Sequence, residues 1–322
     1  MITTHAKTLA ATALAALMLA AQPALAGAKE AKPAAKPAPA KTVQTDKAQK
    51  AQDSATIREK AGARARKTGA GKADIEREKI LAEAVAAVRE TENAIKALDK
   101  KDKKAALDAL ARATGKLEII LAAEPNLALA PVNVQSQVLD IYADIKAVRA
   151  AVDKAVTLLK KGRVQDARAL VSGLASEIVI EVVNVPLATY PEAIKAVVPL
   201  IQKGKFKEAR EALVTALNTL IITRHIIPLP VLRTEEMLAR AEKLAEKAKR
   251  TPEEEKELAG ILKAARTELQ FAEALGYGKE GDFKPFYAQL DKIAAKTKGG
   301  KHGKGFFDEL KKALAHFRAK IF

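Results

Sequence analysis

Six residues in the last quarter of the chain fit the pattern G-x-G-x-x-G, which holds a pyrophosphate in dinucleotide-binding proteins. The match is GYGKEG at positions 276–281. That chemistry requires a strand before the first glycine and a helix that starts within the motif, because the helix N-terminus binds the phosphates. Here a long helical pattern precedes the motif instead. We therefore interpret Gly276 as the end of a helix followed by a turn, and we expect no cofactor.

A single histidine, His225, lies in the part of the sequence that we expect to fold as the core. Histidine ordinarily changes its charge between about pH 5 and pH 8, so His225 could be a pH-sensing group. It could equally be a partly buried, hydrogen-bonded side chain beside a proline turn. Because no second histidine lies at ligand spacing, the sequence predicts no metal site.

Four glutamates crowd the start of a predicted helix, at positions 253, 254, 255 and 257. Paired carboxylates can act as general acid and base. Carboxylates in the first turn of a helix also complement its dipole, and we favour this solvated arrangement. The chain has no cysteine, which excludes thiolate catalysis, disulfides and cysteine zinc sites. The sequence thus predicts a non-enzymatic protein with no catalytic residue; a hydrolase with an unrecognised site stays open as an alternative.

The first 26 residues have the features of a signal peptide. A weakly basic start is followed by a short apolar run and by an A-x-A site that ends at Ala26. We expect cleavage after Ala26 and export to the periplasm. Residues 27–72 are rich in alanine, lysine and proline and lack apolar periodicity, which predicts a disordered linker.

An internal repeat organises the predicted core, residues 73–278. Three related stretches at 98–106, 159–167 and 201–209 each predict a helix, a tight turn and a second helix. Gly162 and Gly204 stand where the first helix ends, a place that favours a left-handed residue. Lys101 holds that place in the first copy, where Asp102 could take the turn instead. The predicted fold is all-α, a bundle of stacked helical hairpins. Apolar stretches at 127–134, 178–191 and 221–232 are rich in isoleucine and valine, so short strands are possible, but their prolines exclude long strands. We interpret them as buried extended connections, with residues 178–183 continuing the preceding helix or forming a brief strand.

The C-terminal residues 279–322 predict a basic amphipathic extension. They hold 11 basic and 5 acidic residues of a chain whose formal net charge is +17. On a helix, five large apolar residues share one face: Phe307, Leu310, Leu314, Phe317 and Ile321. This face could insert into an anionic membrane surface, or it could dock on the bundle or on another subunit. The basic flanks point to anionic lipid or an envelope polyanion as partner, a homo-oligomer stays open, and export argues against nucleic acid.

Several strings resemble the YfdX family of bacterial envelope proteins. They are KLEIIL (116–121), VPLATYP (185–191), HIIPLPVLR (225–233), ALGYG (274–278) and GKGFF (303–307). The similarity runs from about residue 78 to the C-terminus. It implies a helical, exported protein linked to stress responses, and it supplies no established catalytic residues. We therefore predict a non-enzymatic periplasmic binding or protective protein in acid or envelope stress; the alternative is a structural module that attaches to an anionic membrane or envelope surface through its basic flanks.

Overall fold

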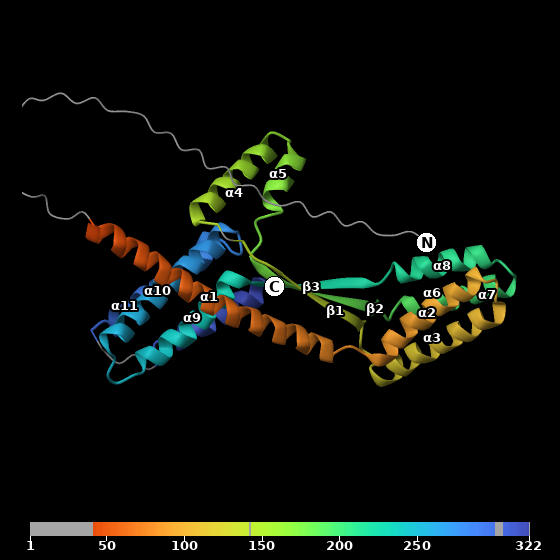
Figure 1. Ribbon diagram of the computed structural model, residues 1–322. Helices are drawn as coiled ribbons and strands as arrows, with labels where there is room; N and C mark the ends of the chain where they lie inside the picture. The colour runs from red at the N-terminus through yellow and green to blue at the C-terminus, as the bar shows by residue number, and fades with distance from the viewer. Residues whose placement is uncertain (1–40, 142, 300–304, 322) are drawn as a thin grey trace, which may run out of the picture. The chain divides into compact units, whose positions relative to one another are not determined.

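The computed structural model describes residues 41–141, 143–299 and 305–321, with side chains described within 52–319. The chain is mostly helical and also contains a three-stranded antiparallel sheet, so its class is α+β (Figure 1). The predicted signal peptide of residues 1–26 lies outside the described residues. Within the described ranges, no helix combines the length and the hydropathy that a membrane span requires.

The sheet has the strand order β1-β2-β3, formed by Leu129–Leu139, Glu177–Pro186 and Ile221–Pro228. Along β2 the side chains of Ile178, Ile180 and Val182 are buried and alternate with partly exposed ones. This period of two places one face of the strand against a core. That face packs against alanine and leucine side chains of the helices α1 and α9.

The prediction of an all-α fold is wrong. The stretches interpreted as extended connections contain most of the three strands, because the prolines of β2 and β3 stand at the strand ends. Pro186 and Pro228 are the last residues of β2 and β3. Pro131 lies in the edge strand β1 beside a shift in register, a place where the missing amide hydrogen costs no ladder bond.

One helical hairpin precedes the sheet in the sequence, and further helices connect its strands. The first consists of α2 (Ala82–Asp99) and α3 (Lys103–Ala123) and comes before β1. The second, α4 (Ile145–Lys160) and α5 (Val164–Val171), connects β1 to β2. Three helices connect β2 to β3: α6 (Tyr190–Lys195), α7 (Val198–Gln202) and α8 (Phe206–Leu217).

The three repeated turns share one backbone conformation. Lys101, Gly162 and Gly204 have φ angles of 55°, 71° and 73°, so each hairpin turns through one left-handed residue. In the first copy the turn conformation is taken by Lys101, while Asp102 caps α3 by accepting a hydrogen bond of 2.9 Å from the amide of Ala105. The repeat in the sequence therefore corresponds to a repeat in structure.

A long helix occupies most of the segment that we predicted to be a disordered linker over 27–72. Helix α1 spans Lys41–Glu78, and residues 27–40 lie outside the described part. Ala61 packs with α9 and α10, and Ala65 and Ala73 pack against the sheet. The prediction failed from residue 41 onward because these contacts use alanine, whose small side chain gives little apolar periodicity yet allows close packing.

Four helices complete the chain: α9 (Leu229–Ala245), α10 (Pro252–Ala274), α11 (Glu280–Thr297) and α12 (Asp308–Ile321). Thr251 and Glu254 form the predicted capping box at the start of α10. Aromatic rings from α11 and α12 are buried in one apolar cluster with side chains of α9 and α10. The described part of the segment 279–322 thus belongs to a core and is not a separate extension.

Candidate functional site

A groove lies on the β3 side of the sheet, between α1 and α12. It has a volume of about 340 Å³, and we call it the β3 groove. Its lining residues come from α1, β2, β3 and α12: Lys72, Ile75, Glu76, Ile180, His225, Ile226, Ile227, Ala315, Arg318 and Ala319. Isoleucine and alanine make the lining largely apolar, and the basic side chains of Lys72 and Arg318 also line the groove. This combination suits a small ligand with one charged end.

Lys72 is the basic group of the groove that is most free to bind an anion. Its side chain is half-buried, and among the described side chains its ammonium forms no hydrogen bond. Burial and the nearby Arg318 guanidinium lower the pKa of Lys72, while the carboxylate of Glu235 opposes this shift. An anion beside Lys72 would offset both the lost hydration and the repulsion from Arg318.

Arg318 is held by a carboxylate behind the groove. Its guanidinium forms an ion pair with the Glu235 carboxylate on α9. Burial raises the pKa of Glu235, although Arg318 and Lys72 oppose this shift. The second carboxylate oxygen of Glu235, Oε1, is buried and has no hydrogen-bond partner among the described residues. Protonation of Glu235 in acid would therefore leave Arg318 unpaired and make the groove more positive.

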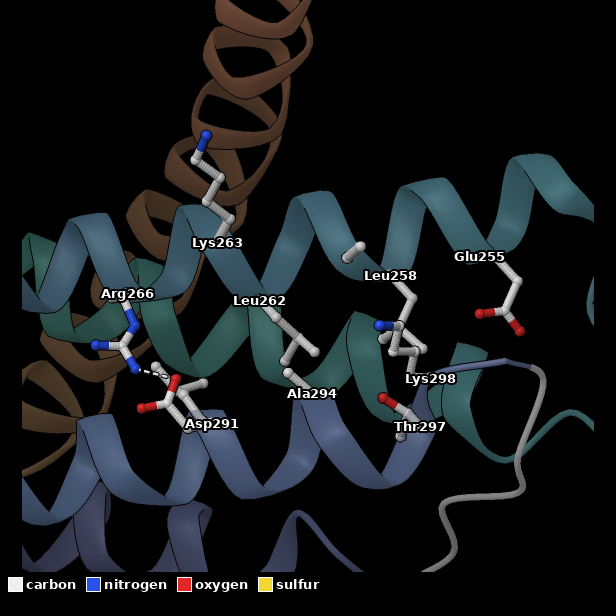
Figure 2. A pocket seen from close by; sticks show the side chains of 11 residues that line it. Glu255, Leu258, Leu262, Lys263, Arg266, Asp291, Ala294, Thr297 and Lys298 are labelled. Carbon is white, nitrogen blue, oxygen red and sulfur yellow. Dashed lines mark hydrogen bonds and ion pairs between the residues drawn. The ribbon is translucent and has the colours of Figure 1, made fainter.

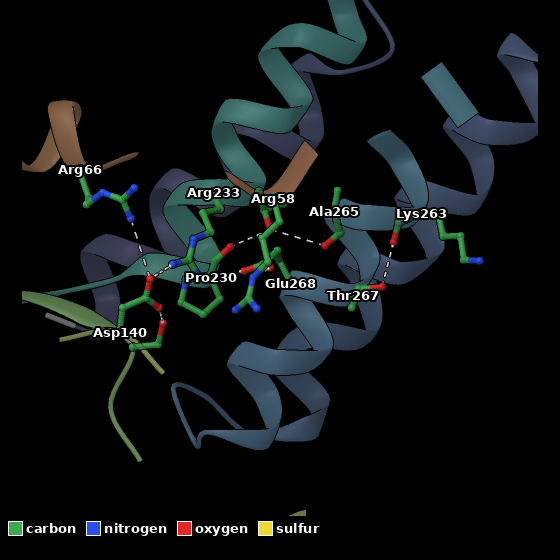
Figure 3. A network of polar contacts seen from close by, with 11 residues as sticks. Arg58, Arg66, Asp140, Pro230, Arg233, Lys263, Ala265, Thr267 and Glu268 are labelled. Atoms are coloured by element: carbon green, nitrogen blue, oxygen red, sulfur yellow. Dashed lines mark hydrogen bonds and ion pairs between the residues drawn. The ribbon is translucent and has the colours of Figure 1, made fainter. Parts of the chain in front are cut away.

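A second constellation of charges lies in the interior, where α1, α9, α10 and the segment after β1 meet (Figure 3). Arg233 is only 2% exposed and forms ion pairs with Asp140 and with Glu268, the latter at 3.3 Å. Arg58 contacts the other oxygen of Glu268 at 2.6 Å. Arg66 reaches Asp140 at 4.0 Å.

Neighbouring polar groups tie this buried network to the start of β2. The hydroxyl of Ser176 donates to Asp140 at 2.8 Å, and its amide donates to the Tyr277 hydroxyl at 2.9 Å. Tyr277 in turn donates to Glu177 at 2.7 Å. Burial, together with the bond to Glu177, raises the pKa of Tyr277, so the hydroxyl stays a donor. Each charge in the network already has a partner, so its role is to hold these elements together.

Another groove, of about 410 Å³, lies between α10 and α11 (Figure 2). Its floor is apolar, with Leu258 and Leu262 among its residues. On its rim, Arg266 pairs with Asp291 and also donates to the backbone oxygen of Tyr287 at 3.0 Å. Lys263 and Lys298 also line this groove, but both are exposed and hydrated, so an anion gains less from them than from the half-buried Lys72 of the β3 groove.

Three of the four glutamates at the start of α10 form ion pairs, two with the exposed Lys247 and Arg240 and one with the buried Arg250. Glu254 pairs with Lys247, Glu255 with Arg250 at 2.8 Å, and Glu257 with Arg240 at 2.9 Å. The hydrogen bond from Lys247 and that from the Thr251 amide lower the pKa of Glu254. This arrangement matches the interpretation as a solvated helix start. In the part of the chain that the structure describes, no three His, Asp or Glu side chains gather closely enough to hold a metal ion.

Gly276 has a φ angle of 81° and follows the end of α10, where the sequence analysis placed a helix stop. Of the predicted tail face, the side chains of Phe307, Leu310, Leu314 and Phe317 are buried in the bundle. Ile321 is the last residue of α12, and its side chain lies outside the described ones. The described residues of this face therefore pack against the bundle and are not exposed for contact with a membrane.

Residues 87–226 match the family model described as YfdX protein. Over this segment the chain is similar to the YfdX family. A solved structure of YfdX from Salmonella Typhi is similar to it, with 17% sequence identity over 47% of this chain and 93% of the other, and a TM-score of 0.32. No curated protein matches the chain.

The YfdX segment includes the three hairpins and nearly all of the sheet, and it ends at Ile226 within β3. The resemblance that the sequence analysis extended to the C-terminus is therefore supported over this segment only. His225 belongs to the YfdX segment. It is exposed on β3, opposite Ile180 of β2, and lines the groove. The partly buried, hydrogen-bonded role that we considered for it does not fit this exposure.

Sequence reasoning missed Lys72, Arg318 and Arg233. Lys72 and Arg318 lie in basic segments with many similar residues, so nothing in the sequence distinguishes the two that meet at one groove. Arg233 did carry a signal, because it ends the otherwise apolar run from Ile226 to Leu232. A charge at the end of such a run is typical of a buried residue with a partner elsewhere in the chain.

Proposed function

We propose that this protein is a non-enzymatic binding protein of the periplasm that takes a small anionic amphiphile into the β3 groove, with a protective role in acid or envelope stress. The observation that carries the proposal is the half-buried ammonium of Lys72, which has no hydrogen bond among the described residues and stands over an apolar floor. A ligand with a negative head and a short aliphatic chain satisfies both parts of the groove.

Two groups link this binding to acid. Protonation of the Glu235 carboxylate frees Arg318, and a protonated His225 adds a positive charge at the mouth of the groove. Both changes favour an anion. The expected direction is therefore tighter anion binding as the pH falls, provided that the ligand itself stays ionised.

Titration calorimetry with 1-octanesulfonate tests the proposal, because a sulfonate keeps its charge in acid. We expect binding by the full chain and a loss of about tenfold in affinity for Lys72→Gln, since removing one partner of a desolvated charge pair costs about 1.4 kcal/mol or more. The matched control is Lys67→Gln, which removes an exposed lysine of the same helix. 1-Octanol, which lacks the charge, should bind more weakly than the sulfonate.

The pH dependence supplies the second arm of this experiment. Lowering the pH from about 7 to about 5 should strengthen binding of the sulfonate in the wild type, and His225→Gln should reduce this gain. Equal affinities in Lys72→Gln and Lys67→Gln would refute the groove as the binding site. An unchanged pH response in His225→Gln would remove this histidine from the acid mechanism.

A further inference from the structure

The three hairpins share a turn but differ in what surrounds it. At the position before the turn, Leu98 is 3% exposed and Ile201 is fully buried. The equivalent Leu159, at the end of α4, is 52% exposed. Ala106, Ala167 and Ala209 are buried in all three copies, so the hairpins themselves are formed alike. The apolar side chain before the turn is therefore buried in two of the hairpins and exposed in the α4–α5 hairpin.

Other apolar side chains of this hairpin are exposed as well. Val164, on the far side of the turn, is 54% exposed, and Val156 and Val171 are similarly open. Only Val148, Ala155 and Ala167 are buried within α4 and α5. Apolar side chains exposed at a turn are in contact with water at a free-energy cost, and burial against a partner surface would remove this cost.

The charge of the hairpin indicates which partner. Residues 145–171 hold seven basic and two acidic residues, and all seven basic side chains are exposed. They are Lys146, Arg149, Lys154, Lys160, Lys161, Arg163 and Arg168. Three of them lie in the turn between Leu159 and Val164. A second copy of the hairpin would carry the same excess of positive charge and would be repelled, whereas an anionic surface would be attracted.

We propose that the tip of the α4–α5 hairpin, residues 159–164, binds an anionic membrane surface. Leu159 and Val164 enter the headgroup region, and Lys160, Lys161 and Arg163 bind lipid phosphates around them. A short apolar tip ringed by basic residues suits reversible binding at the interface, where apolar burial and charge attraction act together. This contact is independent of ligand binding in the β3 groove.

Flotation of the full chain with lipid vesicles tests the apolar part of the proposal. We expect binding to vesicles that contain phosphatidylglycerol, weak binding to phosphatidylcholine alone, and a decrease as salt rises. Leu159→Ser/Val164→Ser should weaken binding by about tenfold or more, because two apolar side chains no longer leave water. The matched control is Val85→Ser/Ile119→Ser, which changes two exposed apolar residues of the α2–α3 hairpin and should bind as the wild type does.

A second pair of variants tests the charges. Lys160→Gln/Lys161→Gln/Arg163→Gln should weaken binding by about a hundredfold, since each basic residue near an anionic surface contributes about a factor of five. Lys203→Gln/Lys205→Gln/Lys207→Gln removes equal charge from the α7–α8 turn and should have little effect. Equal losses in both triple variants would refute the tip and assign binding to net charge. Absence of binding to anionic vesicles, or a change of oligomeric state in the Leu159 variant, would also overturn the proposal.

Discussion

Phe317→Ala provides the strictest test of how the last helix packs. The ring of Phe317 is 6% exposed and meets Phe283 and Phe286 edge to face, with centroid distances of 5.1 Å and 5.4 Å. Truncation of a buried phenylalanine costs about 3–5 kcal/mol. This range already includes the loss of the two aromatic pairs, each of which contributes about 1 kcal/mol. We therefore expect a loss of about 4 kcal/mol in the free energy of unfolding.

Urea denaturation followed by circular dichroism measures this loss as a lower midpoint with an unchanged slope. The neighbouring His316 is exposed on the same helix, so His316→Ala should change stability by about 0.5 kcal/mol or less. If Phe317→Ala costs as little as this control, the ring is not buried in solution. The apolar face of α12 would then be available to a membrane.

Three further results are expected. Arg233→Met should cost about 3 kcal/mol or more, because two buried carboxylates lose the buried cation that they share and keep only Arg58 and Arg66, whereas Arg240→Met at an exposed pair should cost about 1 kcal/mol or less in the same urea assay. Burial raises the pKa of Glu235 in the folded state, so this group contributes stability below the ordinary glutamate pKa and loses the contribution as the pH rises through its folded pKa. The melting temperature should therefore fall over this pH range, and Glu235→Gln should make the fall smaller. Lys101→Gly should raise stability by up to about 1 kcal/mol, since lysine at a φ of 55° is strained and glycine is not; an unchanged melting temperature would contradict this.

The local parts of the fold could be predicted from the sequence. The hairpin turns and the capping box at Thr251 depend on residues within a few positions of each other, so their signals survive in the sequence. The sheet was missed because proline weighs against a strand in any position, and only the pairing of β1 with β2 reveals that Pro131 and Pro186 stand where proline is tolerated.

The candidate site could not be assembled from the sequence for a different reason. His225 was identified because it is the only histidine of its region. Lys72 and Arg318 come from opposite ends of the chain, and only the fold brings them to one groove. The partners of Arg233 could not be predicted for the same reason. Asp140 and Glu268 are far from Arg233 in the sequence, and only the fold brings them together.

The β3 groove is lined by distant segments of the chain, which sets the order in which the proposed binding site can form. Lys72 lies on α1, the first helix of the described chain, and Arg318 lies on α12, the last. A chain that is made from its N-terminus forms the hairpins early, because their contacts are local, whereas contacts between distant segments form late. Ligand binding would then appear only after α12 has joined the bundle. A chain that lacks α12 also lacks Arg318, so it should show no affinity for the proposed ligand.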